Sequence, residues 1–227
     1  MFVGHYGISF VAKSRRPDIP LWVLFIAVQV LDVFWAIFVL LGIEKVRIVP
    51  GYTASSPLDL YYMPYTHGLP GSIAVSLLLG VIVSVFTPGN RARTMLLVAA
   101  ASFSHWVLDF LVHVPDLPLY DNTAKVGLGL WRHVALSFPL ELFFLGLGAW
   151  FYASRTTFAG MKGRNLFFAF VVFLGLVQIY ANFGPPPPSM GAMAISAFGL
   201  YLGLAALAAF VERIATRQPE AGAAELH

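Results

Sequence analysis

The chain has 227 residues and a formal net charge of +3, and its residues are 59% hydrophobic and only 11% charged. Soluble domains carry about 25% charged residues, so this composition excludes an ordinary water-soluble fold. Cysteine is absent, which excludes disulfides and thiolate metal ligands. The charged residues form no basic patch, and we therefore expect membrane lipid, and not nucleic acid, as the partner.

Six segments are long and apolar enough to cross a bilayer, which takes about 20 residues each. They cover residues 21–43, 69–86, 95–114, 134–152, 166–183 and 191–211. The predicted fold is therefore all-α: a polytopic bundle of six transmembrane helices in one domain, residues 1–213. Residues 214–227 are predicted to form a short disordered tail.

The distribution of Lys and Arg predicts how the spans are oriented. Ten of the fourteen basic residues lie before the first span, after the sixth, or in the second and fourth connections between spans. The other connections carry only four. By the positive-inside rule, both termini are expected on the cytoplasmic side.

Residues 1–12 precede the first span and are too few to cross a membrane. One possibility is a half-membrane helix anchored by the basic cluster at residues 13–16. That helix would place His5 about 12 Å above Lys13, near mid-membrane. The alternative is an amphipathic helix lying on the surface with Phe2, Phe10 and Val11 in lipid. Periodicity favours neither.

Three titratable residues, His105, Asp109 and His113, recur at a spacing of four within the third predicted span. On a helix this spacing stacks them along one face at about 6 Å per step. Ionisable groups inside a bilayer are costly and usually mark function. Imidazole and carboxylate are also zinc ligands. The alternative is a polar seam between helices that binds nothing.

Counting residues into each span indicates which other polar groups lie at the same membrane depth as His105, Asp109 and His113, here called the His/Asp ladder. Asp32 and Glu141 reach the depth of His105, whereas His67 and His133 lie at the outer mouths of their spans. A purely structural explanation is also open for three of these residues. Asp32 could be protonated and bonded to a neighbouring helix, and His67 and His133 could be interfacial residues. The long outer loops, 44–68 and 115–132, could cover such a site.

The start of the fourth span could hold an anion. Arg132 and the helix amino terminus beside His133 would suit a phosphate group, although an interfacial anchor explains the same residues. Glu141 is a candidate general base or hydrogen-bond partner of an imidazole. The last two spans, in which Gln178 and Asn182 are the main polar groups, are interpreted as scaffold.

Taken in order, several of these elements resemble the bacterial inner-membrane metal-dependent hydrolase-like proteins of the YdjM type. The resemblance covers residues 1–113 and rests on His5, Asp32, Thr66-His67, and Ser104-His105 with Asp109. Two positions depart from the pattern: Leu31-Asp32 stands where Pro-Asp-x-Asp is usual, and Met63-Pro64-Tyr65-Thr66-His67 where His-Arg-x-x-Thr-His is usual. The resemblance implies a metal-dependent hydrolase in the bacterial inner (plasma) membrane.

The leading hypothesis is metal-dependent hydrolysis of a lipid or lipid-linked phosphoester. It assigns a divalent metal, with zinc favoured over manganese or iron, to His5, Asp32, His67, His105 and Asp109. Glu141 or His113 would be the base, and Arg132 with His133 would bind substrate. A cation or proton transporter using the same ladder is the rival hypothesis. The apolar run at 95–103 favours a one-sided site over a pathway. A non-catalytic protein with a structural metal is the third.

Overall fold

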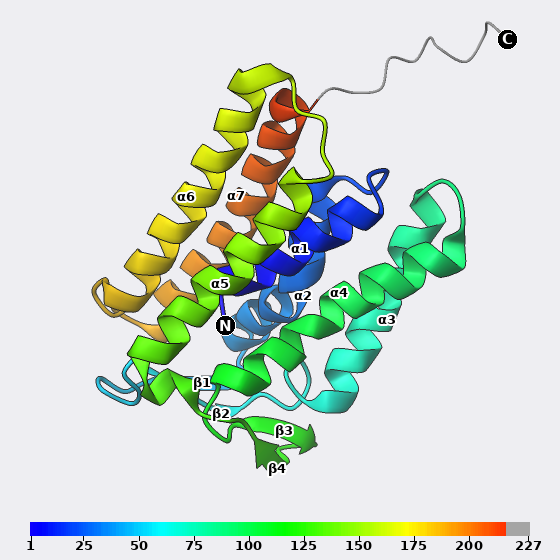
Figure 1. The fold of residues 1–227 in the computed structure, drawn as a ribbon. Coiled ribbons are helices and arrows are strands. Elements are labelled where there is room, and N and C mark those ends of the chain that lie inside the picture. Colours follow the sequence, from blue (N-terminus) through cyan, green and yellow to red (C-terminus); the bar gives the residue numbers. More distant parts are fainter. Residues whose placement is uncertain (217–227) are drawn as a thin grey trace, which may run out of the picture.

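A computed structural model describes residues 1–216 as a bundle of α-helices (Figure 1). The helices are α1 (Val3–Arg15), α2 (Leu21–Leu40), α3 (Leu69–Phe86), α4 (Arg91–Val112), α5 (Val134–Ala153), α6 (Gly160–Phe183) and α7 (Met190–Ala215). The last six are each long and apolar enough to cross a membrane. The all-α fold and the multi-pass membrane class are thus confirmed.

Helices α4 and α7 begin before the apolar segments that predict them, because a polar side chain caps the amino-terminal end of each. The Asn90 side chain accepts a hydrogen bond from the backbone N–H of Arg93 at 3.0 Å, so α4 begins four residues before Met95. Ser189 caps α7 in the same way. At its other end α7 runs to Ala215, past the predicted start of the tail; residues 217–227 lie outside the described residues.

Two antiparallel hairpins and a 3-10 turn occupy the loops at one end of the bundle, here called the hairpin end (Figure 1). Strand β1 (Lys45–Ile48) pairs with β2 (Leu58–Tyr62), and β3 (Leu117–Tyr120) pairs with β4 (Thr123–Val126). The turn η1 spans Leu130–Arg132. The hairpins were not predicted. They are held to the helices by a small apolar cluster that includes Trp35, Leu60 and Leu117.

Helix α1 lies inside the bundle, and its first residues are at mid-height (Figure 1). Val3, His5, Tyr6 and Phe10 are fully buried. The 13 residues of α1 span about 20 Å, which is less than the roughly 30 Å of a hydrocarbon core. The surface-lying alternative is therefore wrong, and α1 is a helix that ends within the bundle.

The opposite end of α1 is fixed by buried charges, and we call this the anchor end. Lys13 pairs with Glu212 of α7 and also donates to the carbonyl oxygens of Pro17 and Ile19 at 2.6 and 2.8 Å. Arg16 donates to Thr94 of α4 at 2.6 Å. The basic cluster predicted to anchor this segment thus does so through the neighbouring helices.

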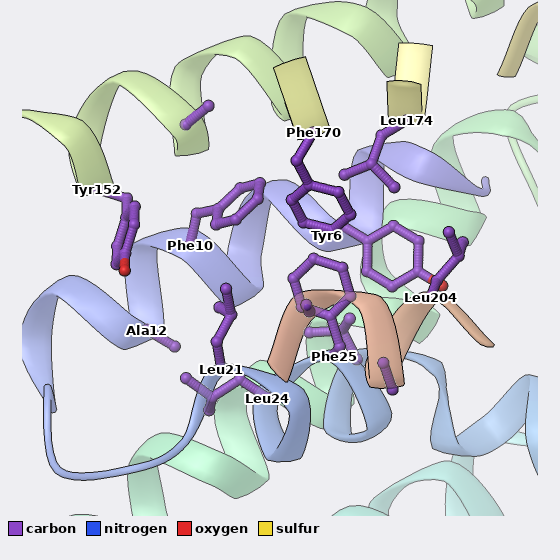
Figure 2. Packing of buried hydrophobic residues seen from close by; sticks show 14 of the residues in the cluster. Tyr6, Phe10, Ala12, Leu21, Leu24, Phe25, Tyr152, Phe170, Leu174 and Leu204 are labelled. Carbon is purple, nitrogen blue, oxygen red and sulfur yellow. The ribbon is translucent and has the colours of Figure 1, made fainter. Parts of the chain in front are cut away.

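Between the anchor end and His5 the bundle is filled by apolar side chains. Figure 2 shows Tyr6 and Phe10 of α1 packed among side chains of α2, α5, α6 and α7. The rings of Tyr6 and Phe25 stack with centroids 4.4 Å apart, and Phe10 meets Phe25 edge-on at 5.6 Å. This cluster closes the bundle on the anchor side of the polar residues described below.

Helices α1 and α5 cross at two glycines. A Cβ atom on Gly7 would lie 2.1 Å from the carbonyl oxygen of Phe144, and one on Gly148 would lie 2.0 Å from the carbonyl oxygen of Gly7. Only hydrogen fits at either position, so the backbones must separate if a methyl group is added.

We predict that Gly148→Ala lowers the unfolding temperature in detergent, because overpacking at a tight contact costs about 1–3 kcal/mol. Gly146→Ala is the matched control: it lies in the same helix, with nothing within 4 Å of its added Cβ, and gains helix propensity. Equal unfolding temperatures for the two variants would contradict the described crossing.

Candidate metal centre

Five predicted ligands meet at the centre of the bundle, although they come from four separate segments. His5 is on α1, Asp32 on α2, His67 just before α3, and His105 and Asp109 on α4. All but Asp32 are at most 2% exposed. Two sets of three, His5–His105–Asp109 and Asp32–His67–His105, each have ligand atoms within 4.8 Å of one another and could hold a metal ion.

Four distances from imidazole nitrogens to carboxylate oxygens in this cluster are close to those between neighbouring ligands of a tetrahedral metal ion. The Nε2 atom of His105 is 3.0 Å from Asp109 Oδ2 and 3.5 Å from Asp32 Oδ1. The Nε2 atom of His67 is 3.7 and 3.3 Å from the same two oxygens. Around zinc, with bonds of about 2.0–2.1 Å, tetrahedral ligand atoms are about 3.3–3.4 Å apart. The four observed distances bracket that value.

Hydrogen bonds at the far side of the imidazole rings direct His105 and His113 toward this centre. The Nδ1 atom of His105 lies 2.7 Å from the carbonyl oxygen of Val28, which can only accept, so Nδ1 carries the hydrogen. His113 Nδ1 likewise faces Asp116 Oδ1 at 2.9 Å. Metal-bound histidines commonly have such a partner, which fixes the tautomer and the ring orientation.

His67 is held by a relay of two residues. Its Nδ1 atom is 2.8 Å from the Thr66 hydroxyl, and that hydroxyl donates to Glu44 Oε2 at 2.6 Å. Since the hydroxyl hydrogen is used on Glu44, the Thr66 oxygen accepts from Nδ1 of His67. The other oxygen of Glu44 accepts the backbone N–H groups of Tyr65 and Thr66 at 2.9 Å, which fixes this turn.

The contacts between these rings and the carboxylates favour a positive charge between them, in addition to the Met1 amino group, which pairs with Asp109. With hydrogen on Nδ1, a neutral ring of His67, His105 or His113 presents its Nε2 lone pair to a carboxylate oxygen, which is repulsive. The Nε2 atom of His105 is buried without a hydrogen-bond partner in residues 1–216. A divalent metal ion, or protons on the imidazoles, would satisfy both partners.

The remaining histidines of the cluster flank Asp109. His113 is the residue after α4, not part of it, yet its Nε2 atom still lies 3.6 Å from Asp109 Oδ2. Its ring packs on Trp131 with centroids 4.0 Å apart. His5 Nε2 is 3.2 Å from the other oxygen, Oδ1, and its ring stacks on His105 at 3.9 Å. The Met1 amino group also pairs with Oδ1, so the two oxygens of Asp109 face different partners.

Glu141 is buried beside the cluster, but its oxygens are engaged by the start of α1. Both accept the backbone N–H of Phe2 at 2.9 Å, and one also accepts that of Gly4 at 2.8 Å. Glu141 therefore caps the helix that carries His5. Arg132 and His133, by contrast, are exposed and do not line the cavity described next.

A cavity of about 250 Å³ opens beside the cluster, with Asp32, His67, Asp109 and His113 in its wall. Helices α6 and α7 also line the cavity, although the sequence analysis interprets them as scaffold. Tyr201 donates its hydroxyl to Asp32 Oδ2 at 2.9 Å, and Gln178 accepts the backbone N–H of Val3 at 3.3 Å.

The sequence signals for these additional residues are unequal. Gln178 is a polar residue in an apolar span, a signal that the scaffold interpretation passed over. Glu44, Asp116 and Tyr201 give no local signal, because their contacts depend on how distant segments pack.

No protein-family model, curated protein or solved structure matches the chain. The resemblance to the YdjM-type proteins therefore stays a prediction, and the site must be interpreted from its own geometry.

We predict that protein purified without chelators contains a divalent metal that is lost in His105→Ala and Asp109→Asn, since each removes a central ligand. Mass-spectrometric metal analysis gives the stoichiometry. His133→Ala, an exposed histidine outside the cluster, should keep the wild-type content. Equal metal content in all four proteins would place the metal elsewhere.

Glu44→Gln should leave every proposed ligand in place but weaken metal binding, because Glu44 holds Thr66 and the turn before His67. Loss of such a partner of a ligating histidine typically costs 10–100-fold in affinity, and competition with a chromophoric chelator measures it. Asp121→Asn, an exposed change in the loop between α4 and α5, should leave the affinity unchanged. An unchanged affinity for Glu44→Gln would show that this contact does not position His67 at the metal centre.

Proposed function

We propose that this protein is a membrane-embedded metal-dependent hydrolase that acts on a lipid or lipid-linked phosphoester. The observation that carries the proposal is the buried His/Asp cluster in the wall of a cavity. Zinc fits the donor set best, with manganese and iron as alternatives. A divalent ion held by Asp32, His67 and His105, with Asp109 beside it, would keep a position for a bound water, acidify that water and polarise the phosphoester.

The closed end of the cavity supports a hydrolase over a transporter. On α6, the cavity residue Gln178 is followed toward the anchor end by Leu174 and Phe170, both buried in the apolar cluster of Figure 2. On α7, Tyr201 is followed in the same way by Leu204. A transport pathway needs polar access from both faces, whereas a hydrolytic site needs only one.

His113 is better placed than Glu141 to accept a proton during the reaction. It lines the cavity, and its bond to Asp116 turns Nε2 toward Asp109. A carboxylate on the far nitrogen fixes the tautomer and the orientation of an imidazole. Glu141 also lines the cavity, but its oxygens accept three backbone hydrogen bonds from α1.

The cavity lining favours an amphipathic substrate. Trp35, Leu60, Met193 and Leu200 supply apolar surface, and Ser55, Gln178 and Asn182 supply hydrogen-bonding groups. The polar part of a lipid would lie among the latter with its phosphoester toward Asp109. Arg132 and His133, outside the cavity, would meet only a portion of the substrate that extends beyond it. By the positive-inside rule, the excess of basic residues at the anchor end supports a cavity on the outer side of a bacterial plasma membrane.

The test is hydrolysis of phospholipids and polyprenyl phosphates by metal-loaded protein in mixed micelles. His113→Gln should retain metal but lose about 10²–10⁴-fold in kcat, the usual contribution of a general base. Asp109→Asn should lose both metal and activity. Lys162→Gln, an exposed change at the start of α6 and outside the cavity, serves as the control.

Two outcomes would overturn the proposal. One is a metal-loaded wild type that hydrolyses no member of the panel. The other is metal or proton flux into liposomes that Asp109→Asn abolishes, which would establish transport.

A further inference from the structure

A second surface feature, unrelated to the cavity, runs between α1 and α4. It is an open groove of about 660 Å³. One wall is formed by Ile8, Val11 and Ala12 of α1, and the other by Leu96, Leu97 and Ala100 of α4. Both sets repeat at helical spacing, so each wall is one continuous face of its helix.

Each wall ends in an arginine at the anchor end. Arg15 follows Val11 on α1, and Arg93 precedes Leu96 on α4; both line the groove and are exposed. Neither takes part in an ion pair or a side-chain hydrogen bond within residues 1–216, in contrast to the neighbouring Lys13 and Arg16. The groove lining contains no acidic residue in that range.

The combination of an apolar floor and two guanidinium groups that have no partner among residues 1–216 specifies one kind of ligand. Guanidinium binds phosphate through paired hydrogen bonds, and the first turn of α4, whose backbone N–H groups point outward, adds positive potential at Asn90. From Ile8 to Arg15 the groove extends about 10 Å along α1. That distance suits the first part of an acyl chain, directly below a headgroup phosphate.

We propose that the α1–α4 groove binds one anionic phospholipid, with its phosphate between Arg15 and Arg93 and an acyl chain along Ile8 and Leu96. The lipid would bridge two helices that carry candidate metal ligands, since His5 is on α1 and Asp109 on α4. This site is separate from the proposed substrate cavity and stands whether or not the protein is a hydrolase.

The experiment compares bound lipid on the full-length protein by native mass spectrometry during titration with phosphatidylglycerol or phosphatidylcholine. Wild type should prefer phosphatidylglycerol. Arg15→Gln with Arg93→Gln should weaken that binding roughly 30-fold, since each basic residue contributes about 1 kcal/mol toward an anionic lipid. Lys162→Gln with Arg164→Gln is the matched control, because it removes two exposed charges from the start of α6, outside the groove.

A third variant tests the apolar wall of the groove independently of the two arginines. Ala100→Trp fills the apolar wall and keeps both arginines, so it should also weaken phosphatidylglycerol binding. The proposal is overturned if the control pair weakens binding as much as the arginine pair. It is equally overturned if glycerol phosphate, which has no acyl chain, competes as well as the lipid; the arginines would then bind a free anion.

Discussion

Two carboxylates in the middle of an apolar bundle are the constraint on which the rest of the structure depends. Asp109 is 1% exposed on a helix that crosses the membrane, where an unpaired charge costs several kcal/mol. His5, His67, His105 and His113 surround Asp109 at 3.0–3.7 Å. The amino-terminal ammonium of Met1 pairs with Asp109, and His5 donates its Nε2 hydrogen to the Met1 carbonyl oxygen. The other three rings carry their hydrogen on Nδ1, so their Nε2 atoms compensate the carboxylates when a proton or a metal ion lies among them.

Three further carboxylates hold the segments that carry the ligands. Glu44 fixes the turn before His67, Asp116 fixes the ring of His113, and Glu141 caps α1. The last contact explains how α1 can begin inside a membrane protein. The first N–H groups of any helix lack partners, and hydrocarbon offers no water to replace them. Glu141 and Gln178 accept these bonds, so a helix too short to span can present His5 at mid-height.

Hydropathy predicted the six spans because bilayer thickness sets their length, and it misplaced their ends where Asn90 and Ser189 extend a helix past its apolar part. The spacing of His105 and Asp109 placed both on one helix face, and counting depth brought in Asp32. His67 was expected at the outer mouth of its span, but the turn held by Glu44 brings it against Asp32. The hairpins and Tyr201 depend on pairing between distant segments, for which one sequence carries no periodic signal.

The same short helix determines how the two ends of the bundle differ. Helix α1 begins at Val3, and the cavity bounded by Gln178 and Tyr201 lies beside its first residues. Below His5, Tyr6 and Phe10 fill the bundle against Phe25, and Lys13 closes it through Glu212. A seventh full span would pack the interior from end to end and leave no room for a ligand. A half-length helix instead places the polar cluster at the boundary between packed and open interior, where a buried cation can be both held by protein and reached from one side.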